Sequence, residues 1–123
     1  MSTLRNITFD CTDPATVAGF WAAVLDREVY PGDNLYMRSI GYPALGTDPA
    51  ASAGPIWLFL AVPEPKTAKN RMYLDLACAD RAAEVARLVA LGATHVRDVA
   101  EWGLEWSVMA DPEGNEFCLS AAH

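Results

Sequence analysis

The chain has 123 residues, of which 52% are hydrophobic and 20% charged, and its formal net charge is −7. This length allows one domain with a real hydrophobic core, whereas the acidic balance argues against nucleic acid and anionic membrane surfaces as partners. An odd number of cysteines fits a reducing compartment, and residues 1–6 lack an export pattern, so we expect a cytoplasmic protein without a membrane-spanning segment.

The first half of the chain predicts a strand, a helix and two further strands. Residues 5–12 alternate between apolar and polar side chains, as in a half-buried strand. Asp13 and Pro14 then form a helix start, and Trp21 lies on the apolar stripe that follows. The two further strands are predicted at 35–40 and 56–62, with a loop at 41–54 between them. The linker is predicted to start at 63–66.

The second half of the chain repeats this pattern. A shift of about 67 positions places Cys11 on Cys78 and Asp13 on Asp80, which indicates a duplicated module. In the second copy Asp80 caps a helix that stops at Gly92. The strands of this copy are predicted at 71–79, 94–99, 104–110 and 116–120, with a turn at 111–115. We therefore divide one domain, 1–123, into a first module of about 1–63, a linker of about 64–70 and a second module of about 71–123.

Four segments together resemble the glyoxalase-like branch of the vicinal oxygen chelate superfamily, which includes bleomycin-resistance proteins and extradiol dioxygenases. They are the helix start DPATVAGFWAAVLDREV, the linker PEPKTAKNRMYLDL, the helix end RLVALGA and the closing segment DPEGNEFCL. The resemblance covers nearly the whole chain. It implies an α+β fold of two tandem βαβββ modules whose mixed sheets form a cup, in which catalytic members hold a divalent metal with four side chains.

The four metal-ligand places of that family fall, one by one, at Asn6, Leu60, Tyr73 and Cys118. A divalent ion in such a cup requires histidine nitrogen and carboxylate oxygen. Leu60 offers no donor atom, a neutral tyrosine is a poor ligand, and one thiolate without histidine partners is a weak basis for zinc. We therefore predict no metal and no cofactor, with a divalent metal held by shifted ligands as the alternative.

Strand parity places a set of polar side chains on the face away from the helices, which would be the cup. The set comprises Asn6, Thr8, Asp10, Tyr73, Asp75, Glu116 and Cys118. Carboxylates that converge on one concavity can raise one another's pKa and act as acid or base. Asp75 is the first candidate for such chemistry, followed by Glu116, with Tyr73 beside them.

A simpler interpretation is that these carboxylates are solvated, or that they pair with Arg38, Lys69 or Arg71. The aromatic side chains Tyr36, Trp102 and Trp106 can line a cleft, which would suit a flat organic ligand. The predicted ligand-binding residues are Asn6, Thr8, Asp10, Tyr36, Leu60, Trp106 and Cys118.

These residues support a leading hypothesis and two alternatives. The leading hypothesis is a glyoxalase-like protein that lacks the family's metal ligands and binds a small organic molecule, in sequestration, in resistance or as an accessory domain. The first alternative is an enzyme, either a lyase, isomerase or dioxygenase with shifted ligands or a metal-free acid–base catalyst that uses Asp75, Glu116 and Tyr73. The second is a scaffold without a ligand. A homodimer is compatible with each hypothesis, because isologous dimers are the commonest assembly.

Overall fold

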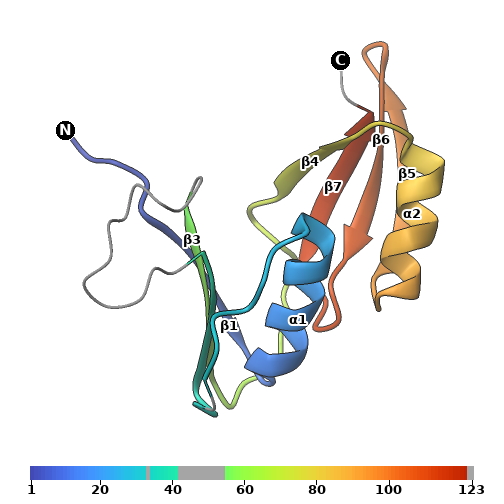
Figure 1. Cartoon of the computed structure of the whole chain (residues 1–123). Helices are drawn as coiled ribbons and strands as arrows, with labels where there is room; N and C mark the ends of the chain where they lie inside the picture. Colours follow the sequence, from blue (N-terminus) through green and yellow to red (C-terminus); the bar gives the residue numbers. More distant parts are fainter. Residues whose placement is uncertain (33, 42–54, 122–123) are drawn as a thin grey trace. The chain divides into compact units, whose positions relative to one another are not determined.

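The computed structural model describes residues 1–32, 34–41 and 55–121, which form two compact units, Met1–Pro65 and Lys66–His123. The boundary between the units lies within the range predicted as the linker. No helix in these ranges has the length and hydropathy needed to cross a bilayer. The elements, labelled in Figure 1, are β1 (Asn6–Cys11), α1 (Pro14–Leu25), β2 (Met37–Ile40), β3 (Ile56–Ala61), β4 (Leu74–Cys78), α2 (Arg81–Ala90), β5 (Thr94–Glu101), β6 (Leu104–Ala110) and β7 (Glu116–Ala121).

The first unit is a three-stranded sheet with α1 against one face. Its strand order is β1-β3-β2, with β1 parallel to β3 and β2 antiparallel to β3. The predicted start of α1 is confirmed, because the Asp13 carboxylate accepts a hydrogen bond from the Thr16 N–H at 3.3 Å and Pro14 is the first helical residue. The predicted loop at 41–54 lies, apart from residue 41, outside the described residues.

Stacked aromatic side chains form the core of the first unit. The parallel register pairs Phe9 with Phe59, and their ring centroids lie 5.5 Å apart. Trp21, on α1, is 1% exposed and stacks on Phe9 at 5.6 Å. These contacts confirm two predictions: the face of β1 that carries Phe9 packs against the helix, and Trp21 lies in the core. The opposite face of β1 carries Asn6, Thr8 and Asp10.

The second unit is a complete βαβββ module, with the mixed strand order β4-β7-β6-β5. Asp80 caps α2 by accepting a hydrogen bond from the Ala83 N–H at 3.1 Å. The buried side chains between α2 and the sheet are Leu88, Met109, Phe117 and Leu119. The predicted α+β fold of repeated modules is thus confirmed, whereas the cup that the two sheets would share stays a prediction.

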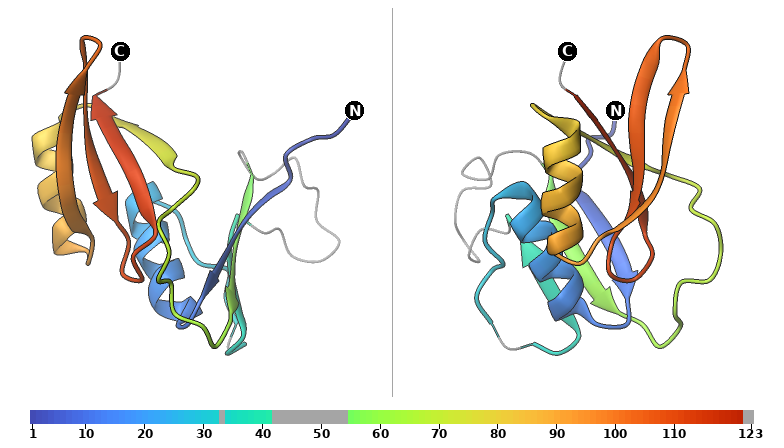
Figure 2. Two further views of the ribbon diagram at one scale, coloured as in Figure 1. Left: turned by 180° about the vertical axis from the view of Figure 1, so that it is seen from behind. Right: turned by 90° about the vertical axis from the view of Figure 1, so that its right-hand side faces the viewer.

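Two strand boundaries in the second unit differ from the prediction by more than one residue. β4 begins at Leu74 rather than at residue 71, so Tyr73 immediately precedes the strand. β5 continues to Glu101 rather than ending at residue 99, because its pairing with β6 runs up to the Glu101–Leu104 pair. The hairpin closes through Trp102 and Gly103, both at positive φ, and Figure 2 shows it extending beyond the other strands of its sheet.

Candidate functional site

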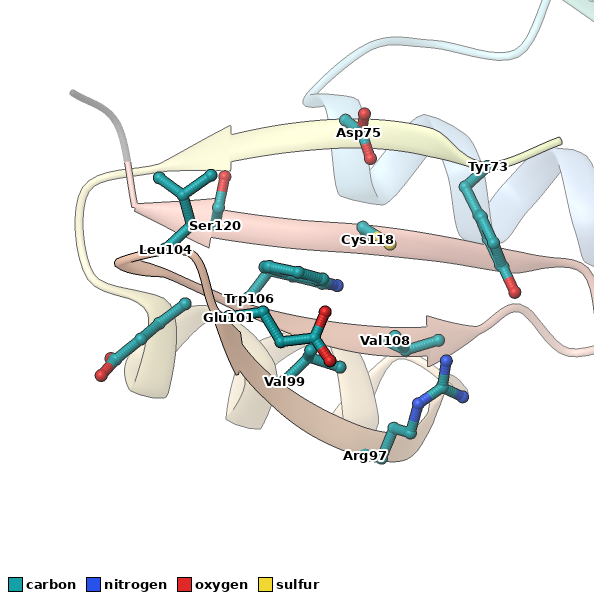
Figure 3. Close-up of a pocket in the computed structure, with 11 residues that line it drawn as sticks. Tyr73, Asp75, Arg97, Val99, Glu101, Leu104, Trp106, Val108, Cys118 and Ser120 are labelled. Atoms are coloured by element: carbon teal, nitrogen blue, oxygen red, sulfur yellow. The ribbon is translucent and has the colours of Figure 1, made fainter.

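The main concave feature of the second unit is a pocket of about 570 Å³ on the sheet face away from α2 (Figure 3). Except for Glu105, the side chains of β6 and β7 that face this pocket alternate with those that pack against α2, as strand periodicity requires. The lining residues are Tyr73, Asp75, Arg97, Val99, Glu101, Leu104, Glu105, Trp106, Val108, Cys118 and Ser120.

The strand register orders these side chains into rows across the sheet. Asp75 on β4 pairs with Cys118 on β7, Cys118 pairs with Val108 on β6, and Val108 pairs with Arg97 on β5. In the next row Trp106 pairs with Val99. Apolar and uncharged groups therefore form the floor of the pocket, and charged groups lie at its two edges.

The pocket unites four of the predicted site residues, Tyr73, Asp75, Trp106 and Cys118. Glu116 does not line it. The sequence prediction missed the other lining residues, above all Arg97 and Glu101 on β5. Arg97 lies within the strand predicted at 94–99, and continuing its alternation beyond residue 99 would also have indicated Glu101, because residues 97, 99 and 101 share one face.

The remaining predicted residues belong to the first unit. Asn6, Thr8 and Asp10 lie on the sheet face opposite Phe9, and Leu60 is the register partner of Asp10. The Asn6 Oδ1 atom is buried and has no hydrogen-bond partner among the described residues. Tyr36 precedes β2 and is 75% exposed, with its N–H donating to Asn34 Oδ1. Tyr36 lines none of the pockets described for this unit.

Lys69 joins Glu116 to Tyr73 at the edge of the pocket. Its Nζ lies 2.9 Å from Glu116 Oε1, donates a hydrogen bond to the Tyr73 hydroxyl and lies 4.6 Å from the centre of that ring. The hydrogen bond from Lys69 lowers the pKa of Glu116, and the bonds to Tyr73 and Glu116 raise the pKa of Lys69. The expectation that neighbouring carboxylates raise one another's pKa is therefore wrong for Glu116, and the predicted pairing with Lys69 is confirmed.

The Lys69–Glu116 pair predicts a pH dependence of stability. The pKa of Glu116 in the folded state lies below 4.5. Its contribution to the free energy of unfolding is therefore present above the pKa of the unfolded state and is lost as pH falls through the pKa of the folded state. The pKa of Lys69 in the folded state lies above 10.5. Its contribution to the free energy of unfolding is therefore lost only as pH rises through this raised pKa. Urea unfolding of wild type and Glu116→Gln should therefore differ most between about pH 5 and 10 and converge in acid. A difference that persists unchanged well below pH 3 would contradict this assignment.

The cysteine thiols and the family's metal-ligand places do not fit a metal ion. All three cysteines are free. Burial, together with the carboxylate of Asp75, raises the pKa of Cys118, which keeps its thiol protonated and unsuited to coordination. The Tyr73 hydroxyl is already bound by Lys69, and Leu60 offers no donor atom. Within the described residues no group of three or more His, Cys, Asp or Glu could hold a metal. We therefore derive no chemistry through a metal.

A second polar cluster lies on the α2 side of the same sheet and is centred on Asp98. Asp98 Oδ1 accepts a hydrogen bond from Ser107 Oγ at 2.7 Å and lies 2.8 Å from His95 Nε2. Arg81, the first residue of α2, donates to Ser107 Oγ at 2.9 Å and lies 3.3 Å from Asp98 Oδ1. This cluster ties the edge strand β5 to β6 and α2.

The sequence profile of the glyoxalase-like domain matches residues 6–120. The chain belongs to the glyoxalase-like domain family. A search of curated proteins gave no match. Similar folds occur in a glyoxalase/bleomycin resistance protein/dioxygenase family enzyme of Burkholderia phytofirmans, with 15% identity, a TM-score of 0.73 and coverage of 99% of this chain and 100% of that one.

Two further solved structures share the fold of this glyoxalase-like protein. One is a fosfomycin resistance protein of Listeria monocytogenes complexed with Mn(II) and 1S,2S-dihydroxypropylphosphonic acid, with 13% identity, a TM-score of 0.76 and coverage of 100% and 92%. The other is the bleomycin-binding protein of Streptomyces verticillus complexed with copper(II)-bleomycin, with 12% identity, a TM-score of 0.60 and coverage of 100% and 98%. At these identities the likeness establishes the fold alone.

Proposed function

We propose that this glyoxalase-like protein binds a small organic molecule in the pocket of its second unit, without a metal ion, in a sequestering, resistance or accessory role. The observation that carries the proposal is the pocket itself, whose volume of about 570 Å³ lies within the range of roughly 300–1,000 Å³ found for small-molecule sites. An apolar floor with a few polar groups at its edges is the usual composition of such sites.

Trp106 supports an aromatic or otherwise flat ligand. Its indole lies half-buried in the pocket and stacks with Trp102 at a centroid distance of 6.4 Å and an interplanar angle of 20°. Val99 lies beside it in the same row and Val108 lies in the neighbouring row, so a flat molecule against Trp106 would contact both aliphatic and aromatic side chains. The proteins that bind bleomycin and a phosphonate in related folds are consistent with small-molecule binding, although their ligands are not carried over.

The test is a screen of flat organic compounds by ligand-detected NMR, followed by calorimetry on the best compound. We expect Trp106→Ala to weaken its binding about tenfold, because the stacking surface and the apolar contact are both lost. Trp102→Ala is the matched control: Trp102 does not line the pocket, so its loss should change the affinity less. Failure of every compound to bind, or equal affinities for wild type and Trp106→Ala, would contradict the proposal.

The contact between Lys69 and Tyr73 favours a second candidate, a metal-free acid–base enzyme that acts on the same ligand. An ammonium group beside a phenol stabilises the negative charge that develops on the oxygen when the proton is transferred to a substrate. For a compound that is turned over, Tyr73→Phe should lower kcat at least about a hundredfold with little change in affinity. Unchanged kcat in Tyr73→Phe and in Asp75→Asn would exclude this candidate.

A further inference from the structure

The pocket of the second unit has opposite charges at its two edges. Asp75 and Arg97 are the ends of one row, Asp75–Cys118–Val108–Arg97, that crosses all four strands. Three strand spacings separate their backbones by roughly 14 Å. Figure 3 shows this order, with the guanidinium of Arg97 turned inward toward Val108. The two groups therefore face one cavity from opposite sides.

Neither charge is neutralised by a counter-charge within its own unit. The ion pairs among the described residues join Lys69 with Glu116, Arg81 with Asp98 and Glu105, Arg87 with Glu84, and His95 with Asp98. None of them includes Asp75 or Arg97. Lys69, Glu116 and Glu105 around the site are thus already paired, whereas Asp75, Arg97 and Glu101 remain available to a ligand.

The surface between the two charges is uncharged. Val108 is 1% exposed, and the thiol of Cys118 is neutral because burial raises its pKa. Trp106 lies in the adjacent row and offers its ring alongside. A ligand that spans the row therefore meets an apolar floor in its middle and a fixed charge at each end.

We propose that the ligand is an elongated zwitterion with a flat apolar body, whose cationic group is bound by Asp75 and whose anionic group is bound by Arg97. This inference rests on the proposed function and specifies the class of molecule. A guanidinium is the side chain best suited to a carboxylate or phosphate, because its N–H groups form two parallel hydrogen bonds with such an anion. A carboxylate in turn accepts hydrogen bonds from an ammonium group.

Glu101 is the competing position for the cation. It lies on the same strand and the same face as Arg97, and it lines the pocket near Trp106. A ligand that used Glu101 and Arg97 would lie along one edge strand rather than across the sheet. Removing the charge of Glu101 therefore distinguishes a ligand that lies across the sheet from one that lies along β5.

The probes are four benzene derivatives, titrated at neutral pH by ligand-detected NMR with the full chain. 4-(Aminomethyl)benzoate carries both charges, benzylamine only the cation, 4-methylbenzoate only the anion, and 4-methylbenzyl alcohol neither. We expect the zwitterion to bind at least about threefold more tightly than either singly charged probe, and the alcohol to bind most weakly.

Three variants, each of which removes one charge, locate the contacts. Asp75→Asn should remove the advantage of the zwitterion over 4-methylbenzoate, and Arg97→Gln should remove its advantage over benzylamine. Glu101→Gln, the matched control, should preserve both advantages. Because all three side chains are exposed, thermal unfolding is expected to stay close to that of the wild type.

The outcomes separate this inference from the proposed function. Equal affinity of all four probes would overturn the zwitterion and leave the pocket as a binding site. Loss of the ammonium preference in Glu101→Gln instead of Asp75→Asn would overturn the assignment of Asp75. Binding by none of the probes would overturn the inference, and failure of the broader compound screen as well would overturn the proposed function.

Discussion

Replacing Trp21 with alanine is expected to lower the free energy of unfolding by about 3–5 kcal/mol, the range found for large-to-small changes at buried aromatic positions. Trp21 is 1% exposed, and its ring lies 5.6 Å from that of Phe9, 5.3 Å from that of Trp57 and 5.5 Å from that of Phe20. The alanine variant removes the common partner of three rings and leaves a cavity between α1 and the sheet. Urea unfolding, monitored by circular dichroism, measures the loss.

Trp102→Ala is the control for this prediction, because it deletes the same side chain at a position that is 85% exposed. We expect a change within about 1 kcal/mol for Trp102→Ala. If the two variants unfolded at similar urea concentrations, Trp21 would not be the centre of the core of the first unit.

Replacing Asp111 with alanine is expected to cost about 2–3 kcal/mol, because the carboxylate of Asp111 holds the turn before β7. Asp111 is 3% exposed, its Oδ1 accepts the N–H groups of Glu113 and Asn115 at 2.9 and 3.0 Å, and its Oδ2 accepts the side-chain amide of Asn115 at 2.8 Å. Alanine leaves these donors without their acceptor. The same hydrogen bonds hold residues 111–115, the segment that the sequence predicts as a turn.

Asp111→Asn distinguishes hydrogen bonding from simple loss of volume. Its side-chain oxygen can still accept from the two backbone N–H groups, so we expect asparagine to recover about half of the loss in unfolding free energy caused by alanine. An asparagine variant as unstable as the alanine variant would contradict this account. Because the turn leads directly into β7, which carries Cys118, the alanine variant should also weaken ligand binding in the pocket.

The elements of the fold follow from local patterns, which explains why the sequence predicts them. Asp13 and Asp80 each cap a helix with the side-chain bond that their residue type suggests, and the alternation around Phe9 correctly separates the core face from the open face. These features depend on residues close together in the sequence, or on a period that a strand imposes.

The site was only partly predictable, because its decisive contacts join residues far apart in the chain. The pairing of Lys69 with Glu116 brings together side chains from the linker and from the last strand, and the sequence offered Lys69 only as one of three possible partners. The register from Asp75 to Arg97 depends on which strands are neighbours in the sheet, and a period alone does not give this order. The position of Arg97 across the pocket from Asp75 therefore emerges only from the structure.

The cluster around Asp98 has a consequence for the proposed binding of a ligand in the pocket. Asp98 directly follows Arg97 on the edge strand, so the strand segment that presents the guanidinium to the pocket is held from its opposite face by Ser107 and Arg81. This anchoring preorganises the wall of the pocket during folding, which reduces the conformational entropy that remains to be lost on binding. We therefore expect the affinity for the proposed ligand to depend in part on side chains that this ligand would not touch.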